Sequence, residues 1–186
     1  MEFNMKKMMF LIASALLPLV VFGRVRVDVH GVQVTLKEVK AAGLSVGTTP
    51  AKATEKISKA VLISGTIGKE WKKFEFSFVP EKDGRVILRF HTPGSRNINA
   101  IIPVLVDNVQ AAGGTLLNGS FETVKNGKLT GWNLGTKGKI ITGDNVADGK
   151  QCVQTFFSSG MATQAMVVSA GEKVTVTFMA KPLTEN

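Results

Sequence analysis

The stretch PVLVDNVQAAGGTLLNGSFETVKNGKLTGWNL, residues 103–134, decides how the rest of the chain is interpreted. It lies between two groups of short predicted strands, and its glycine-containing centre, QAAGGTLL, could pass for a boundary between domains. Each flanking group, however, has too few predicted strands to complete a β-sandwich alone. We therefore expect one domain over residues 24–186, in which this stretch joins two halves of the same sandwich.

Alternation of apolar and polar residues predicts β-strands along the whole chain after residue 23. In RVRVDVHGVQVTLKEV the side chains of Val25, Val27 and Val29 fall on one face. KKFEFSFV (72–79) and RVILRFH (85–91) alternate in the same way, and turn signals such as EKDG, TPGS and SAGE separate the strands. About ten short strands of this kind predict an all-β sandwich or barrel.

The first 23 residues are predicted to be an export signal that is cleaved after Gly23. A short basic start, MKK from Met5, precedes the apolar run MMFLIASALLPLVVFG, in which Val21 and Gly23 fit the small residues of a cleavage site. Pro18 interrupts this run, which falls short of the roughly 20 residues that a membrane span needs. We expect a secreted or cell-surface protein without a membrane span after cleavage. Retention of the segment as an N-terminal anchor is the alternative.

The composition narrows the classes of ligand. The formal net charge is +9, which favours acidic polysaccharide, envelope phosphate or nucleic acid as a partner. The basic residues are dispersed and are not interleaved with exposed-looking aromatic residues, so nucleic-acid binding is not expected. A solvated basic surface is the alternative interpretation of the charge. Cys152 is the only cysteine and cannot form an internal disulfide.

Five motifs resemble those of the calcium-containing jelly-roll carbohydrate-binding modules, galactose-binding-like β-sandwiches that are often appended to glycanases. They cover nearly the whole chain after residue 23. The resemblance implies a jelly-roll β-sandwich of two antiparallel sheets, with a non-catalytic function in binding a polysaccharide or other glycan. The motifs are VLVDNV (104–109), NGSFE (118–122), GW (131–132), GKEWKKFEFSFV (68–79) and SAGEKVTVTFMAK (169–181).

The order of these motifs differs from the order in the family, where the NGSFE half precedes the VDNV half. We interpret the difference as a circular permutation, in which QAAGGTLL joins the old ends. The new ends would then fall between strands 173–181 and 24–30, which we expect to be neighbours. Two alternatives remain. The chain is the end of one module followed by the start of the next, or strand 24–30 pairs with 173–181 of another chain and builds a self-assembling filament or surface-layer subunit.

The resemblance also implies a structural calcium site beside the joining stretch. Glu122 of NGSFE and Asp107 of VDNV would supply carboxylates, and backbone carbonyls near Ser120 and Lys150 would complete the shell. Calcium prefers hard oxygen ligands, and two acids on adjacent strands repel each other unless a cation lies between them. The alternative is that both acids cap turns or pair with lysines.

A polar set on the face opposite the predicted core residues is the candidate glycan-binding surface. The chain has no Tyr and two Trp, and Trp71 and Trp132 fall where the family uses the ring mainly for packing. The region TFFSSGMATQ offers Phe156, Phe157 and Met161 where a binding ring would be convenient. A charged groove would suit an acidic or highly hydroxylated ligand, whereas a solvated sheet face is the alternative. The candidate ligand-binding residues are Arg26, Asp28, His30, Arg89, His91 and Arg96.

Catalysis is not expected. Glycosidases need two carboxylates at a defined separation, and Asp28 with Glu75 is the one pair that the alternation suggests. His30 and His91 could share a face, but the sequence shows no third metal ligand and no nucleophile paired with a base.

Overall fold

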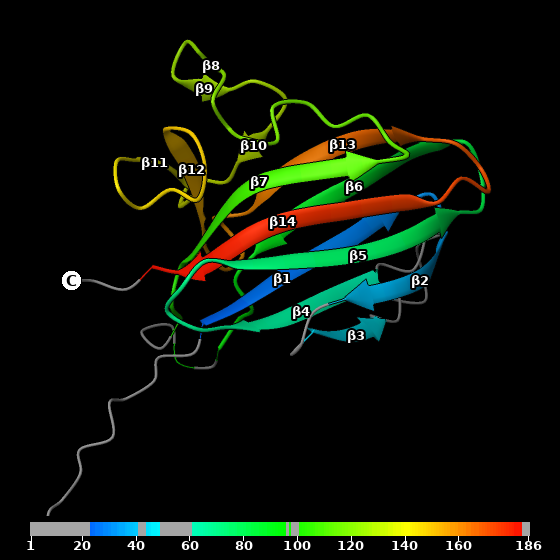
Figure 1. Ribbon diagram of the computed structural model, residues 1–186, viewed down its shortest axis with the longest axis horizontal. Coiled ribbons are helices and arrows are strands. Elements are labelled where there is room, and N and C mark those ends of the chain that lie inside the picture. Colours follow the sequence, from blue (N-terminus) through cyan, green and yellow to red (C-terminus); the bar gives the residue numbers. More distant parts are fainter. Residues whose placement is uncertain (1–22, 41–43, 49–60, 96, 98–100, 184–186) are drawn as a thin grey trace, which may run out of the picture.

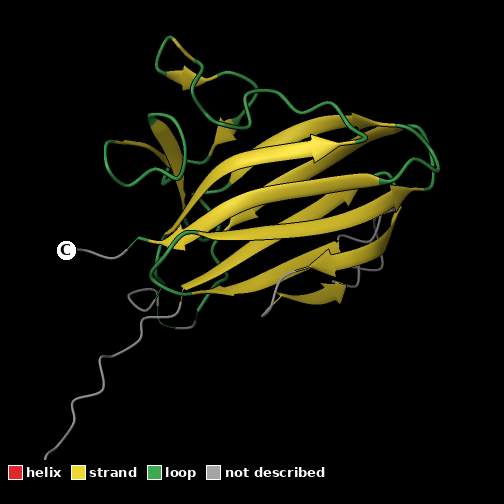
Figure 2. Ribbon diagram, in the orientation of Figure 1, coloured by secondary structure: helices red, strands yellow, loops and turns green. Residues whose placement is uncertain are grey.

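The protein is an all-β sandwich in the computed structural model, which describes residues 23–40, 44–48, 61–95, 97 and 101–183 (Figure 1). Every regular element within these residues is a β-strand (Figure 2). The strands form two six-stranded antiparallel sheets and one two-stranded hairpin. This confirms the predicted fold class of two antiparallel sheets. The predicted export signal lies outside the described residues, apart from Gly23.

The two sheets have a simple relation to chain order. Sheet A has the order β10 (Asn133–Leu134), β13 (Ala162–Val168), β6 (Gly84–His91), β1 (Gly23–Gly31), β4 (Val61–Ile67) and β3 (Leu44–Thr48). Sheet B has the order β11 (Lys139–Thr142), β12 (Gln151–Thr155), β7 (Val104–Ala112), β14 (Val174–Pro182), β5 (Lys72–Pro80) and β2 (Val34–Lys40). The hairpin consists of β8 (Val124–Lys125) and β9 (Lys128–Leu129). β3 of sheet A and β2 of sheet B are therefore the edge strands on one side of the sandwich. β10 of sheet A and β11 of sheet B are the edge strands on the other side, and each pair is consecutive in the chain.

The core between the sheets contains the side chains that the alternation predicted. Phe74 of sheet B stacks on Phe178 with 5.1 Å between ring centroids, and Phe90 of sheet A meets Phe178 edge-on at 5.1 Å. Each fully buried side chain of this size contributes about 1.5–3 kcal/mol through removal of apolar surface from water. The predicted core residues that are fully buried are Val25, Val27, Val29, Phe74, Phe76, Phe78, Val86, Leu88 and Phe90.

The predicted pairing of strand 24–30 with strand 173–181 is wrong. β1 lies inside sheet A between β4 and β6, and β14 lies inside sheet B between β5 and β7 (Figure 1). Both edges of each strand are hydrogen-bonded within the chain, so exchange through this pair would have to break an existing ladder. The two strands instead face each other across the core. A Cβ atom on Gly23 would lie 2.8 Å from Cβ of Pro182, so the start of β1 contacts the end of β14.

The NGSFE motif forms the loop that follows the joining segment, residues 110–117. The amide of Val109 donates to the carbonyl of Gly119 at 2.8 Å, and the Asn118 side chain binds the backbone of Thr123 in both directions. Phe121 is fully buried and has a φ of 60°, a conformation that is uncommon for an aromatic residue. The loop is thus held by backbone contacts while it inserts Phe121 into the core.

Gly119→Ala should lower the free energy of unfolding by about 2–3 kcal/mol. A Cβ atom at this position would overlap the Val109 carbonyl oxygen, so the loop would have to move away from β7. Gly68→Ala is the matched control, because a Cβ atom there has no neighbour within 4 Å. Urea unfolding followed by circular dichroism measures both variants. Equal midpoints for the two would contradict this account of the loop.

Candidate functional site

Five of the six predicted ligand-binding residues lie together on the outer face of sheet A, the side that points away from the core. β1 and β6 are antiparallel neighbours, with Arg26 opposite His91 and Asp28 opposite Arg89. His30 follows on the same face of β1, because alternate residues of a strand share a face. We call these five residues the polar cluster.

Arg96, the sixth predicted residue, lies outside the described residues. Its neighbours Gly94 and Ser95 belong to the loop that leaves the end of β6.

Asp28 is the centre of the polar cluster. Its Oδ1 accepts a hydrogen bond from Nε of Arg26 at 3.0 Å, and its Oδ2 lies 3.2 Å from Nε2 of His91. The second contact is within ion-pair distance but lacks hydrogen-bond alignment, so its attraction is mainly electrostatic. Asp28 is only 9% exposed. Burial raises its pKa, but the contact with His91 and the charge of Arg26 outweigh burial and hold the pKa of Asp28 below its ordinary value.

The His91 ring lies between two acceptors. Nδ1 is 3.2 Å from the Thr92 carbonyl oxygen, and Nε2 faces the Asp28 carboxylate. A carbonyl oxygen can only accept, so Nδ1 carries the hydrogen of this bond. The neutral ring can donate to one of these acceptors, whereas the protonated ring can serve both. The ring is 4% exposed and is held between the Thr92 carbonyl and the Asp28 carboxylate.

Arg89 and Nε2 of His30 are the groups of the cluster that have no hydrogen-bond or ion-pair partner within the described part of the chain. The half-buried guanidinium of Arg89 makes no hydrogen bond or ion pair with another described residue. Nε2 of His30 is buried and has no hydrogen-bond partner among the described residues. Burial lowers the pKa of His30, and the charge of Arg89 lowers it further, while Asp28 acts in the opposite sense. The face thus offers a cation and a neutral imidazole to a ligand.

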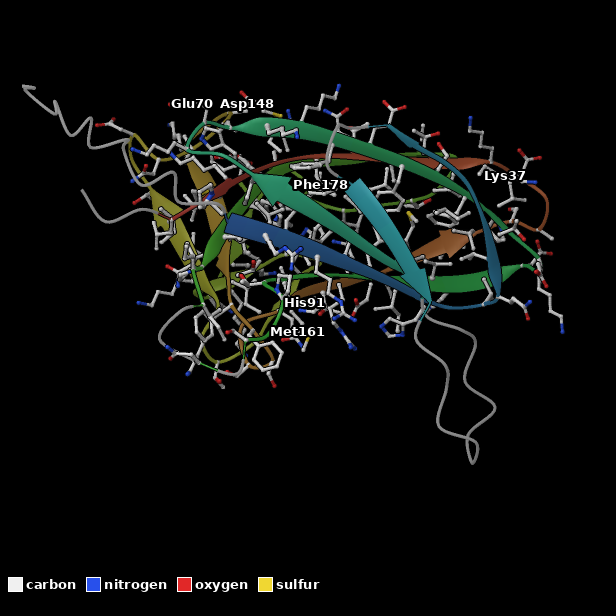
Figure 3. The ribbon with its side chains drawn as sticks, turned by 90° about the horizontal axis from the view of Figure 1, so that it is seen from below. Lys37, Glu70, His91, Asp148, Met161 and Phe178 are labelled. Carbon is white, nitrogen blue, oxygen red and sulfur yellow. The ribbon has the colours of Figure 1, made fainter. Side chains whose placement is uncertain are left out.

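An aromatic ring extends this face beyond His91. Phe157 is 37% exposed, and its ring packs against Gly94, where any Cβ atom would overlap it. Met161 lies next to His91 on the same side of the molecule (Figure 3). The sequence left Phe156 and Phe157 as equal candidates. Phe156 is half-buried, with Nζ of Lys137 5.0 Å from its ring centroid, so Phe157 is the exposed ring.

The two tryptophans lie apart from the polar cluster. Trp132 is 6% exposed and packs against Phe90 and Phe121, as its predicted packing role requires. Trp71 is half-buried, with Nζ of Lys181 5.5 Å from its ring centroid on sheet B.

The carboxylate pair that the alternation suggested for glycosidase chemistry is separated by the sandwich. Asp28 lies on the outer face of sheet A. Glu75 alternates with Phe74 and Phe76, which are buried on the inner face of sheet B, so its side chain lies on the outer face of that sheet. Packed sheets lie about 10 Å apart, and each outer side chain adds to this separation. The two acids cannot act on one glycosidic bond.

Asp107 holds the loop between β11 and β12, residues 143–150. Its Oδ2 accepts the amides of Ala147 at 2.9 Å and Asp148 at 3.1 Å, and its Oδ1 accepts the amide of Asn108 at 2.7 Å. A β-bulge at Asn108, with a φ of 46°, shifts the register here. Burial raises the pKa of Asp107, and the loop amides oppose this shift.

Glu122 holds the other end of the same loop. Its Oε1 accepts the amides of Lys150 at 2.8 Å and Gln151 at 2.9 Å. Lys150 thus contacts Glu122 through its amide, whereas the sequence analysis expected its carbonyl as a calcium ligand. Ser120 makes no hydrogen bond with either acid in the described part of the chain. No group of three or more His, Cys, Asp or Glu side chains suited to a metal is found in the described part of the chain.

Comparison with protein-family models, with curated proteins and with solved structures finds no match to this chain. None of the described segments is a helix long and apolar enough to cross a membrane. Functional conclusions therefore rest on the geometry of the sites.

Asp28→Asn should lower the free energy of unfolding at pH 7 by about 2–4 kcal/mol, because Arg26 and the buried His91 lose their anionic partner. The folded pKa of Asp28 is depressed, so its contribution is complete above the unfolded value of about 3.9 and is lost as the pH falls through the folded pKa. The difference between wild type and variant should therefore shrink below about pH 4. Urea unfolding between pH 2.5 and 7 measures it.

Asp107→Asn is the control, because the pKa of Asp107 shifts in the opposite direction. A raised folded pKa means that ionisation is penalised in the folded state, so the wild type gains stability relative to this variant as the pH falls. Parallel pH profiles for the two variants would contradict the assigned electrostatics.

Proposed function

We propose that this protein is an exported, non-catalytic module that binds an acidic glycan on the outer face of sheet A. The observation that carries the proposal is the guanidinium of Arg89, which has no partner among the described residues and lies beside a carboxylate that already contacts Arg26 and His91. Arginine binds carboxylates and sulfates through paired N–H groups, which suits uronic acids and sulfated sugars.

The contacts within the polar cluster support binding rather than mere solvation. Asp28 fixes Arg26 and His91 in position, so a ligand that contacts this face immobilises fewer side chains when it binds. Two arginines and two histidines surround one carboxylate, and the whole chain carries a formal charge of +9. The exposed ring of Phe157 adds an apolar surface of the kind that sugar rings stack on.

The resemblance to the jelly-roll carbohydrate-binding modules supports the same function, and the permuted order of the motifs is part of the proposal. VLVDNV lies on β7 and VTVTFMAK on β14, at the centre of one sheet. The contact between Gly23 and Pro182 brings the start of β1 to the end of β14. A short link could have connected these two positions, while residues 110–117 now connect the two halves.

A structural calcium ion near the loop at 143–150 belongs to the same proposal. Asp107 and Glu122 are hard oxygen ligands that face one loop from different segments, which fits a hard cation in part. Oε1 of Glu122 accepts both hydrogen bonds that the carboxylate makes with described residues, which leaves Oε2 without one there. When bound, the ion would relieve the repulsion between these acids and stabilise the loop.

Arg89→Ala should weaken binding of oligogalacturonate by about tenfold or more, because a charge-assisted contact is lost. Arg85→Ala is the matched control, since Arg85 is exposed on the same face of β6 about 13 Å away. Isothermal titration measures both variants after a screen on a glycan array. The proposal fails if no glycan binds, or if both variants lose affinity equally.

Calcium should raise the melting temperature of the wild type above its value in chelator. The free energy of unfolding should rise by about 2–3 kcal/mol when free calcium is at a hundredfold excess over the dissociation constant. Glu122→Gln should remove most of this gain. Asp144→Asn changes an exposed acid of the same loop and should retain it. Equal melting temperatures in calcium and in chelator would remove the ion from the proposal and leave the loop held by amides alone.

A further inference from the structure

A pocket is lined by residues of the β8–β9 hairpin, β10 and β11 and of the turns beside them. These elements lie close together at the edge of the sandwich (Figure 1). The pocket has a volume of about 420 Å³, which falls in the range of small-molecule sites. Its apolar floor is formed by four side chains that pack against or belong to the core. These are Leu129, Trp132, Leu134 and Ile140.

The floor of the pocket is fixed by hydrogen bonds behind it. Nε1 of Trp132 donates to the carbonyls of Leu117 and Asn118, at 3.0 and 2.9 Å. The polar edge of the indole is thereby satisfied, and its carbon atoms are left to line the pocket. Gly138 on the opposite wall donates its amide to the carbonyl of Gly135 at 2.8 Å, which closes the turn between β10 and β11.

The rim of the pocket carries one lysine, Lys128, which belongs to a basic stretch of the chain. Residues 123–143 contain four lysines and no acidic residue. Lys128 is exposed and lines the pocket, while its cross-strand partner Lys125 does not line it. Asn133, also exposed, adds an amide side chain to the same rim. An apolar floor with a cationic rim fits a small anion that has an apolar face and hydroxyl groups.

The register of sheet A connects this pocket with the polar cluster. Asn133 of β10 lies opposite Thr163 of β13, Thr163 lies opposite Arg89 of β6, and Arg89 lies opposite Asp28 of β1. Directly opposed residues share a face, so one polar row runs across the strands from the pocket to the cluster. With about 4.8 Å between strands, Asn133 and Arg89 are about 10 Å apart.

We propose that the pocket holds a terminal sugar that carries a carboxylate or sulfate group, while the following sugars of the same glycan lie across sheet A toward Arg89. This inference rests on the proposed function and adds to it the polarity of the ligand, its direction across the strands and a second cation, Lys128. Lys128 pairs with the acidic group of the terminal sugar, and the floor around Trp132 contacts the apolar face of its ring.

The experiment uses a galacturonic acid trisaccharide and a neutral xylotriose as probes. Trp132 and Trp71 are the two tryptophans of the chain, so Trp71→Phe makes the intrinsic fluorescence report on the pocket alone. In this background the galacturonic acid trisaccharide should change the fluorescence saturably, and xylotriose should not. Lys128→Ala should weaken binding about tenfold or more, and the matched control Lys125→Ala by less than about twofold.

Arg89→Ala, tested in the same titration, separates the two assignments. If Arg89→Ala abolishes binding but Lys128→Ala does not weaken it, the assignment of the terminal sugar to the pocket is overturned and the proposed function stands. If Lys128→Ala abolishes binding and Arg89→Ala does not, the pocket stands and the cluster loses its role. Equal losses for Lys128→Ala and Lys125→Ala would overturn the pocket in favour of diffuse attraction to the lysines. If the galacturonic acid trisaccharide does not bind, both proposals are overturned.

Discussion

A carboxylate on a β-strand can be buried only where its charge is compensated, and the charge of Asp28 is compensated by Arg26 and His91. These contacts require the register in which Arg26 of β1 lies opposite His91 of β6. A slip of one residue would turn the polar side chains of β1 into the core and its valines toward solvent. The hydrophobic core and the ion pairs therefore select the same register. Because that register also brings Arg89 opposite Asp28, the packing of the sandwich and the composition of the polar cluster follow from one constraint.

The loop around NGSFE has a similar double role at the other end of the molecule. The carbonyl of Asn118 accepts a hydrogen bond from the indole N–H of Trp132. Glu122, the last residue of the motif, holds the loop at 143–150 through the amide of Lys150. The segment around NGSFE thus helps to fix both the floor of the edge pocket and the loop at 143–150. Rigid support of this kind is what a binding site on loops needs, since loops alone define side-chain positions less well than strands.

Alternation in the sequence was enough to identify which residues face the core, because a period of two follows directly from strand geometry. It placed Val25, Phe76 and Leu88 inside and Arg89 outside. It carries no information about which strands are neighbours, so it could not show that β1 and β14 belong to different sheets, or that Glu75 lies on the far side from Asp28. The edge pocket was missed for a related reason. Turns and two-residue strands build it, and its available signal was the run of lysines without acids at 123–143.

The residues of the polar cluster differ in their contacts and in their pKa shifts, and these differences suit binding better than acid–base chemistry. A general acid needs a carboxyl that retains its proton near neutral pH, whereas the contacts of Asp28 hold its pKa low and keep it ionised. Asp28 then holds the side chains of Arg26 and His91 in place. Arg89 has no anionic partner among the described residues, which leaves it for the ligand that we propose, and burial and the charge of Arg89 both lower the pKa of His30. A preorganised, net positive face next to an exposed ring is the arrangement that the proposed binding of an anionic sugar requires.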